Sequence, residues 1–432
     1  MKKIKIATIT DSPKCTTGFG NVARMLLDGF HKSGMEVYSF GTMDFNFDID
    51  GELPYQFFPS NPFNPDGHKT VPLFLVGVQP DVIFILFDPG TTGTFLSVIG
   101  SMWEAGSLKK CPIVLYTPIE GFPVPISTAV TLSRVLDGGG KVVLYSQGMV
   151  DTVVKQYPQF DGYLDFVHHG LDHAPFRKYS DDYRKLIRKF VNLDDYFVAG
   201  SIGVNKRTKG LDTIIYTARC LKDMGKADGI KFYLHTSSNK PTMLGYNLED
   251  LCINYDVEDM IIFKPEADVE EGGNINGIPR DNEGFVFENP SLKNLNKLSF
   301  IDRLNMFDCY LDLSQVEGWG LPLGEAMRCG VPSISVSDKA IREEVYKSGV
   351  IWVDTEPVRL WNTWHVGQKL ALVDPLKAAE AILELKNSSD DMRKFWSDQA
   401  INTANKYNWL ESVNKMNTII RETVESYELS SM

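Results

Sequence analysis

The sequence predicts an α/β protein with two Rossmann-like, doubly wound parallel sheets, one in each of two domains that face a central cleft. The chain has 432 residues, about three times the length typical of one domain. Short β-branched runs alternate with longer amphipathic stretches, as in parallel sheets covered by helices. The alternation restarts after Asp172, so we expect one domain over residues 1–172 and a second over residues 173–408.

The first cycle of strands and helices occupies residues 1–172. We expect strands at residues 4–9, 37–40, 82–87, 113–116 and 141–145, and a helix at residues 21–32. Most of these strands are near-continuous apolar runs, which is typical of strands buried on both faces. Residues 40–63 are rich in Phe and Pro and should form a long surface loop. This loop is expected either to take part in recognition or to cover the core as a hydrophobic flap. The glycines at 138–140 should form a helix-to-strand turn.

The second cycle repeats the pattern after a connection at residues 168–177. We expect strands at residues 197–203, 231–234, 260–263, 309–313 and 333–336, and helices at residues 208–224 and 321–329. Residues 268–292, with paired acids followed by alternating Asn and Gly, suggest an insertion or a lid. Residues 177–190 hold six basic side chains and should form an amphipathic helix. Its basic face is expected to be solvated, with a nucleic-acid contact as the alternative.

Composition excludes several classes of protein. Charged residues make up 23% and hydrophobic residues 43% of the chain, as in a globular protein and unlike a disordered one. The net charge of −12 disfavours undirected binding of polyanions. The six cysteines form no CxxC pair or Cys/His cluster, which argues against a zinc site or a disulfide framework. With no signal peptide or membrane-spanning run in the sequence, we expect a cytoplasmic protein.

The clearest functional pattern is SQVEGWGLPLGEAMRCG at residues 314–330. A glycine turn at Gly318 and Gly320 leads into a helix near Pro322, and the free amides and dipole of such a helix attract an anion. Glu317 and Glu325 flank that site, and two carboxylates repel a phosphate. They suit hydroxyl groups on either side of a diphosphate, which is the layout of a nucleotide sugar. The alternative is a well-capped structural helix.

The spacing Glu317-x7-Glu325, within EGWGLPLGEAMRCGVP, resembles the E-x7-E signature of retaining GT-B glycosyltransferases of family 4. Four other segments follow the order of that family: a glycine loop at residues 17–20, a hinge-like HGLD at 169–172, Lys209-Gly210, and NWLE at 408–411. The helix at 409–428 should then cross back onto the first domain. The resemblance spans nearly the whole chain and is strongest over residues 309–332.

This resemblance implies a GT-B fold and transfer of a sugar, with retention, from a nucleotide-diphosphate sugar to an acceptor hydroxyl. It implies no metal and no cofactor besides the donor. Asp48-Ile49-Asp50 spells D-x-D but lies in a polar loop, so we expect no metal there. Glu325 would bind the ribose, Glu317 the transferred sugar, and Lys209 the diphosphate. The amides expected to hold the diphosphate are those of Gly318, Trp319, Gly320 and Leu321.

Some positions depart from the family or are assigned less directly. The family has Arg five residues before the lysine, where this chain has Val204, so Lys206 or Arg207 is expected to supply the second cation. Gly18 and Gly20 would approach the phosphates from across the cleft. After first-domain strands, Glu120 is the candidate for a catalytic contact with the reacting sugar, and Asp88 is a second candidate. His168 and His169 are expected to be hinge residues rather than catalysts.

Two other interpretations of the protein's function stay open. Residues 18–23 fit the dinucleotide fingerprint G-x-G-x-x-A, although eight residues separate the first glycine from its strand. A sugar-nucleotide epimerase or an NAD-dependent enzyme is therefore one alternative, and a nucleotide-sugar-binding module without turnover is another. A saccharide is the first expectation for the acceptor. Modified DNA is the minority option, because the basic run lies near the hinge, although residues 1–170 hold 12 Lys and Arg against 16 Asp and Glu.

Overall fold

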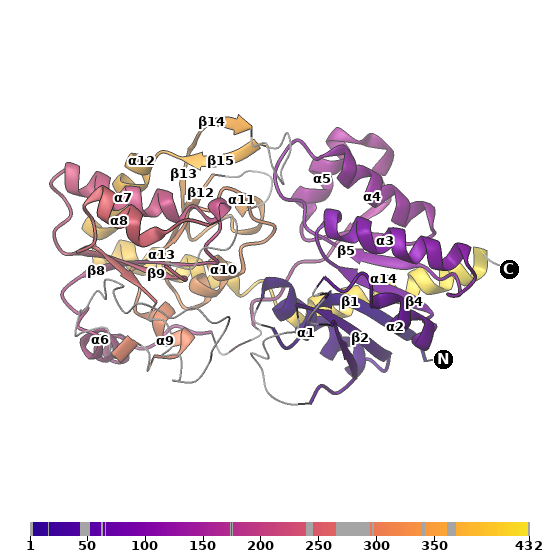
Figure 1. Ribbon diagram of the computed structural model, residues 1–432. Coiled ribbons are helices and arrows are strands. Elements are labelled where there is room, and N and C mark those ends of the chain that lie inside the picture. The colour runs from indigo at the N-terminus through magenta and orange to yellow at the C-terminus, as the bar shows by residue number, and fades with distance from the viewer. Residues whose placement is uncertain are drawn as a thin grey trace, which may run out of the picture.

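The computed structural model describes residues 3–15, 17–43, 52–61, 64, 66–172, 174, 176–238, 245–264, 294–295, 298–337, 342–360 and 369–430. Within these ranges the strands form a seven-stranded sheet, a six-stranded sheet and a two-stranded pair. The two larger sheets lie in separate halves of the molecule, each covered by helices (Figure 1). The predicted α/β class with two doubly wound parallel sheets is confirmed.

The first sheet has the order β3-β2-β1-β4-β5-β6-β7, with every neighbouring pair parallel. Its strands are β1 (Lys5–Asp11), β2 (Glu36–Thr42), β3 (Gln56–Pro59), β4 (Val82–Leu86), β5 (Ile113–Tyr116), β6 (Lys141–Leu144) and β7 (Leu164–Phe166). Its helical segments are α1 (Gly18–Lys32), α2 (Val71–Val78), α3 (Pro89–Glu104), α4 (Ile126–Asp137), α5 (Gln147–Gln156) and the 3-10 turn η1 (Pro158–Phe160). The sequence order changes direction between β1 and β4, and ligands of such sheets bind beyond the carboxyl ends at that point.

The second sheet has the order β10-β9-β8-β11-β12-β13 and is also parallel throughout. Its strands are β8 (Phe197–Ile202), β9 (Ile230–His235), β10 (Ile261–Phe263), β11 (Cys309–Asp312), β12 (Ser333–Val336) and β13 (Val350–Val353). Its helical segments are α6 (Asp181–Phe190), η2 (Arg207–Lys209), α7 (Leu211–Asp223), α8 (Leu248–Tyr255), α9 (Phe300–Asn305), α10 (Leu321–Arg328), α11 (Arg342–Val345), α12 (Pro375–Asn387) and α13 (Asp390–Ala404). The strands β14 (Thr355–Leu360) and β15 (Lys369–Val373) form an antiparallel pair. Here the order changes direction between β8 and β11.

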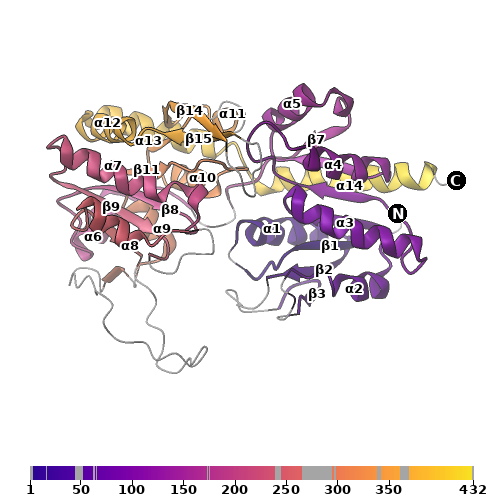
Figure 2. The same cartoon turned by 45° about the horizontal axis from the view of Figure 1, so that its top comes forward.

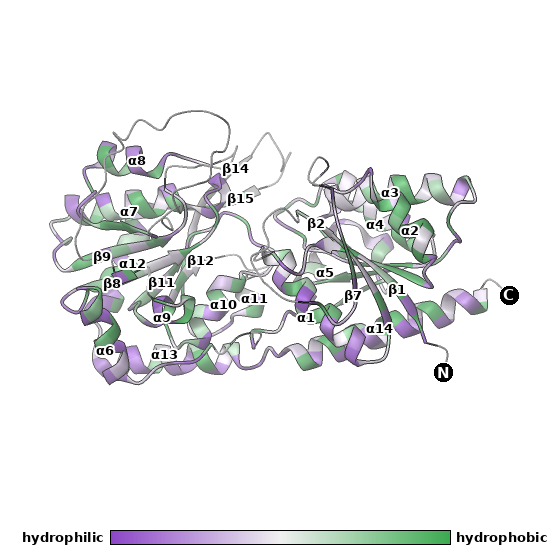
Figure 3. Cartoon of the chain, turned by 60° about the horizontal axis from the view of Figure 1, so that its bottom comes forward, coloured by the Kyte–Doolittle hydropathy of each residue, from purple (hydrophilic) through white to green (hydrophobic). Residues whose placement is uncertain are grey.

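The last helix, α14 (Trp409–Ser430), returns to the elements of the first sheet (Figure 2). Arg421 Nη2 donates to the carbonyl of Ser33 at 3.1 Å, and Ser33 Oγ donates to Asn417 Oδ1 at 3.3 Å, which ties α14 to the end of α1. Hydrophilic and hydrophobic residues alternate along α14, as expected of a helix with one buried face (Figure 3). The domain boundaries near residues 172 and 408 stay a prediction.

Residues 40–63 were expected to be one surface loop, and this is wrong for part of the segment. Residues 40–42 complete β2, and β3 adds a parallel edge strand, with Tyr38 paired to Gln56. Most residues of β3 are exposed, as expected of an edge strand, and its sequence QFFP is not the continuous apolar run that marks a buried strand. Residues 44–51, 62 and 63, which include the D-x-D sequence, and the predicted insertion at 268–292 lie outside the described residues.

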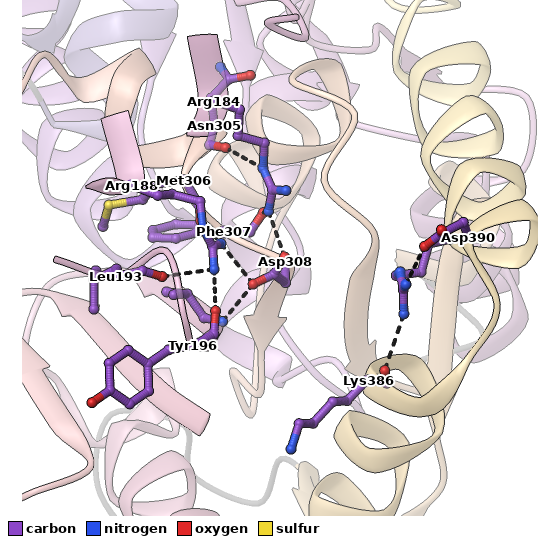
Figure 4. Close-up of polar contacts among 12 residues, drawn as sticks. Arg184, Arg188, Leu193, Tyr196, Asn305, Met306, Phe307, Asp308, Lys386 and Asp390 are labelled. Carbon is purple, nitrogen blue, oxygen red and sulfur yellow. Dashed lines mark hydrogen bonds and ion pairs between the residues drawn. The ribbon is translucent and has the colours of Figure 1, made fainter. Parts of the chain in front are cut away.

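Residues 181–190 of the basic run form α6, and the two arginines of this helix do not lie on a solvated face. Arg184 and Arg188 point toward Asp308 (Figure 4), at 2.6 Å and 2.8 Å between nitrogen and oxygen. Arg188 also donates to the carbonyls of Met306 and Leu193, and its side chain is only 7% exposed. The expectation of a solvated face is therefore wrong for Arg188, although Lys185 and Lys189 are exposed.

Candidate functional site

A pocket lies at the carboxyl ends of β8 and β11, where the second sheet changes direction. Its lining includes Gly203, Lys209, Asp312, Glu317, Gly320 and Pro322. Parallel α/β sheets bind ligands at such switch points. Lys209 comes from the turn after β8, and Glu317 comes from the turn after β11. Residues 108 positions apart in the sequence therefore meet at one edge of the sheet.

Lys209 and Glu317 form an ion pair inside this pocket, between Nζ and Oε1. The side chains are 28% and 15% exposed, so both groups keep a path to solvent or to a ligand. Burial by itself lowers the pKa of Lys209, but the carboxylates of Glu317, Asp312 and Glu120 together outweigh burial and raise it. Lys209 therefore stays charged at neutral pH and offers a cation to an anionic ligand.

The turn that carries Lys209 is built on Gly210. This residue has a φ of 64°, and a Cβ there would lie 2.1 Å from the carbonyl oxygen of Leu313. Only glycine meets both constraints. The amide of Gln315 donates to the carbonyl of Thr208 at 2.8 Å, which joins this turn to the one that carries Glu317. The close approach of the two turns fixes the spacing of the ion pair.

Two helices begin at the pocket, and neither has a side-chain cap. Gly210 precedes α7 and Gly320 precedes α10, both in the left-handed conformation and without a capping side chain. Leu211 and Pro322, at the starts of these helices, line the pocket. Amides left without an intrahelical partner, together with the helix dipoles, favour a negatively charged group here.

The segment from Gly318 to Glu325 also joins this pocket to the first sheet. A Cβ at Gly318 would lie 2.7 Å from Pro118 Cβ, so the turn rests directly on the loop after β5. Trp319 is buried, and its ring lies 5.3 Å from that of His169, measured between centroids. Glu325, on the second turn of α10, is only 5% exposed and does not line the pocket.

The structure separates the predicted site residues into three groups. Lys209, Glu317 and Gly320 line the pocket, while Gly318, Trp319 and Leu321 continue the same turn. Glu120 acts electrostatically on Lys209 from the first sheet. Lys206 and Arg207 are not among the residues that line the pocket. Lys206 acts electrostatically on Asp11 of β1, and Arg207 lies over the ring of Tyr246, 5.5 Å from its centroid. Their role as the second cation stays a prediction.

The predicted glycine loop at residues 17–20 is instead the start of a helix. Thr17 caps α1, and its hydroxyl accepts from the amide of Gly20 at 2.9 Å. Gly18 and Gly20 therefore belong to the first turn of α1, and the amide of Gly20 already has a partner. The expectation of a free loop is wrong, because Thr17 is a good N-cap residue placed directly before the glycines.

Sequence reasoning missed Asp312 and Tyr310, and it included Ser314 only as the first residue of the motif; all three line the pocket. Asp312 is buried and accepts from Ser335 Oγ at 3.1 Å. Tyr310 donates to the carbonyl of Ile202 at 3.2 Å and so joins β11 to β8. The sequence did contain a signal for Asp312, an acidic residue at the end of the apolar strand Cys309–Asp312, because charged side chains are rarely buried unless they are paired.

His169 sits at the crossing between the two halves in a defined tautomer. The hydroxyl of Tyr116 lies 2.7 Å from the carbonyl oxygen of Val167 and 2.7 Å from His169 Nδ1. A phenol has one proton, and a carbonyl can only accept, so Tyr116 donates to Val167. His169 must therefore carry a proton on Nδ1 and donate it to Tyr116. This places His169 in a structural network, and its role at a hinge stays a prediction.

Acid should destabilise the protein through His168, which lies among Phe166, Trp319 and Tyr407. Burial, with a smaller effect of Lys415, lowers the pKa of His168 to about 4 from 6.5. The unfolded chain then binds the proton first, so stability is lost as the pH falls from 6.5 toward 4, by at most about 3 kcal/mol.

Urea unfolding at pH 8 and pH 5 checks this expectation. The variant His168→Phe keeps an aromatic ring and should show a smaller loss of stability between the two pH values than the wild type. His235, whose pKa burial lowers to about 3, acts in the same direction and is retained in both proteins. An equal pH dependence in the variant would contradict the assignment to His168.

Comparison with known proteins connects this chain to solved structures alone. No family model matches it, and no curated protein sequence is significantly similar. Sucrose-phosphate synthase from Thermosynechococcus elongatus is 14% identical, with 97% of this chain and 99% of that chain covered, at a TM-score of 0.64. HepE of Anabaena, solved in complex with UDP-glucose, is 14% identical over 99% and 100% of the two chains, at a TM-score of 0.62.

WaaG, a glycosyltransferase involved in lipopolysaccharide biosynthesis, is 13% identical, with 96% and 99% of the chains covered and a TM-score of 0.62. Likeness at this level of identity establishes the GT-B fold of this chain. Among the described residues, no helix is long and apolar enough to span a bilayer. The same residues contain no group of three or more His, Cys, Asp or Glu suited to hold a metal ion.

Proposed function

We propose that this protein is a retaining glycosyltransferase, similar to family 4, that moves a hexosyl or pentosyl group from a nucleotide-diphosphate sugar to an acceptor hydroxyl. The observation that carries the proposal is the pocket where Lys209, Glu317 and two uncapped helix starts meet. A diphosphate needs a cation and amide donors, and a sugar needs a hydrogen-bond acceptor beside them. The similar structures that hold UDP and UDP-glucose are of the same fold.

In the proposed mechanism the protein stabilises the leaving diphosphate and positions the reactants. Lys209 neutralises charge as it develops, and the amides at the start of α10 add fixed donors. Glu317 orients the transferred sugar, and Glu325 binds the ribose. No protein nucleophile takes part: a diphosphate oxygen accepts the proton of the acceptor hydroxyl on the face that the diphosphate leaves. Lys209 and the starts of the two helices take the role that a metal ion has in other glycosyltransferases. The cytoplasmic location that is expected from the sequence also stays a proposal.

The stereochemistry of the product tests this proposal. The protein is incubated with nucleotide sugars and a panel of acceptors, and the anomeric configuration of donor and product is compared by NMR. Transfer with the same configuration is the expected result. Formation of a new sugar nucleotide without any acceptor would instead support an epimerase. Tight donor binding with neither transfer nor hydrolysis would support a binding module.

Substitution of Gly318 should lower activity through the contact between the two halves. In Gly318→Ala the new methyl group would lie 2.7 Å from Pro118 Cβ, well inside a normal carbon–carbon contact. The turn that holds Glu317 must then shift by about 1 Å, and such a shift lowers turnover by roughly 10–100-fold.

Steady-state kinetics check this expectation beside the control Gly100→Ala. Gly100 lies in α3, where an added Cβ meets nothing within 4 Å. The control should keep wild-type turnover. Equal turnover in Gly318→Ala would mean that the contact with Pro118 does not set the geometry of the site.

A further inference from the structure

Three carboxylates follow three neighbouring strands of the first sheet. Asp11 ends β1, Asp88 comes directly before α3 at the end of β4, and Glu120 lies in the loop after β5. The strands β1, β4 and β5 are adjacent and parallel, so their carboxyl ends meet at one side of the sheet. We refer to Asp11, Asp88 and Glu120 as the acidic edge.

Two members of the acidic edge are held in place by hydroxyl groups. Asp11 accepts from Thr17 Oγ1 at 2.7 Å and from Thr42 Oγ1 at 3.0 Å. Asp88 accepts from the amide and the hydroxyl of Thr91, at 2.9 Å and 2.6 Å. Burial raises the pKa of Asp11, the two hydrogen bonds lower it, and the charge of Asp88 adds to the rise. Each carboxylate oxygen can still accept a further hydrogen bond.

A buried hydroxyl without a partner points to a ligand at this edge. Tyr145 follows β6, the next strand of the sheet, and is 4% exposed. Its Oη has no hydrogen-bond partner among the described residues. Burial raises the pKa of Tyr145, and the charges of Glu120 and Asp88, which follow neighbouring strands of the same sheet, add to the rise. Buried polar groups are normally paired, and an unpaired one at a candidate site suggests that a ligand completes it.

The acidic edge faces the pocket of the second sheet. Glu120 acts electrostatically on Lys209, and Lys206 acts electrostatically on Asp11. The ring of Tyr145 lies 3.6 Å from the position of a Cβ on Gly318, next to Glu317. An acceptor that reaches a sugar bound at Glu317 therefore comes from the side of the acidic edge.

We propose, on the basis of the proposed function, that the acceptor is an uncharged polyhydroxylated molecule of the saccharide class whose hydroxyls bind Tyr145 and the acidic edge. Carboxylates accept hydrogen bonds from sugar hydroxyls and repel phosphate groups. The names of two structurally similar enzymes, sucrose-phosphate synthase and trehalose-phosphate synthase, refer to phosphorylated sugars. For this chain the acidic edge disfavours an acceptor that carries a phosphate group. It also disfavours DNA, whose backbone carries a charge about every 1.7 Å. The two arginines of α6 that could have met DNA are paired with Asp308.

Matched pairs of acceptors test the proposal with the full chain. The donor is the nucleotide sugar that binds best, and the acceptors are glucose with glucose 6-phosphate, maltose with maltose 1-phosphate, and an oligonucleotide that carries 5-hydroxymethylcytosine. The uncharged member of a pair should have a kcat/KM at least tenfold higher. Preference for a phosphorylated sugar or the oligonucleotide, or no transfer to any uncharged acceptor by a protein that binds donor, would overturn the proposal. Failure to bind any nucleotide sugar would contradict the proposed function itself.

The variant Tyr145→Phe removes only the unpaired hydroxyl. Its Tm should equal or exceed that of the wild type, its donor Kd should be unchanged, and its kcat/KM for the acceptor should fall about tenfold, which is the usual effect of losing one hydrogen bond. The control is Tyr163→Phe, at a tyrosine that is 60% exposed. Equal acceptor kinetics in the two variants would remove Tyr145 from the acceptor site.

Discussion

Replacement of Lys209 by methionine should lower turnover by about 10²–10³-fold, the effect of removing one donor that stabilises a developing negative charge. Lys209 is the cation that lines the pocket beside two helix starts, and its pKa is raised by the surrounding carboxylates. Because the charge on the diphosphate grows in the transition state, kcat should fall along with kcat/KM. A loss confined to KM would mean that Lys209 binds the donor equally in the ground and transition states.

Two further variants separate this effect from damage to the fold. Lys209→Met leaves the carboxylate of Glu317 without its partner, so the double variant Lys209→Met/Glu317→Gln removes both charges together. The double variant should recover stability and should not recover turnover. Lys226→Met, at an exposed lysine just beyond α7, is the matched control and should retain wild-type kinetics. Full activity in Lys209→Met would remove this residue from the mechanism.

Replacement of Asp308 by alanine should destabilise the protein by about 3–5 kcal/mol, the usual result of removing one partner of a buried ion pair. Asp308 pairs with Arg184 and Arg188 (Figure 4). It also accepts from the amide of Val198 at 2.7 Å. Without it, the buried guanidinium of Arg188 would lose the carboxylate with which it forms an ion pair. The contacts join α6 to the first strand of the second sheet, so that half of the molecule should lose stability.

Urea unfolding followed by circular dichroism measures the loss. Asp259→Ala is the matched control, because Asp259 is 67% exposed and pairs with Lys222 at 3.0 Å. An exposed pair of this kind contributes about 1 kcal/mol or less. If the two variants were equally stable, the buried network would not hold α6 in place.

The fold and the core of the pocket could be predicted because both are encoded locally. Each buried strand is an apolar run, and the turn from Glu317 to Pro322 combines glycines, an acid and a helix start within a few residues. Lys209-Gly210 is similarly compact, since the lysine and the glycine that allows its turn are adjacent. The charge arrangement of the pocket therefore follows from two short segments and the order of the strands.

The remaining features depend on contacts between distant parts of the chain. Arg188 is a surface residue by every local criterion, and only the approach of Asp308, 120 positions later, buries it. The sequence predicts Tyr145 at the end of an apolar strand, and only the folded structure shows that its hydroxyl is buried without a hydrogen-bond partner among the described residues. The prediction of a glycine loop at residues 17–20 is wrong because Thr17 caps a helix that begins at Gly18.

The central claim, a nucleotide-sugar site at the switch point of the second sheet, is tested most directly by ligand-induced thermal stabilisation. The wild type and Glu325→Ala are screened together with UDP-, GDP-, ADP- and TDP-sugars and with NAD. A ligand at about 100 times its Kd adds roughly 2.7 kcal/mol of stability. We predict that at least one nucleotide sugar raises the Tm of the wild type. The same ligand should raise the Tm of Glu325→Ala by less, with each protein compared with its own ligand-free Tm. Stabilisation by NAD alone, or by none of these ligands, would contradict the account.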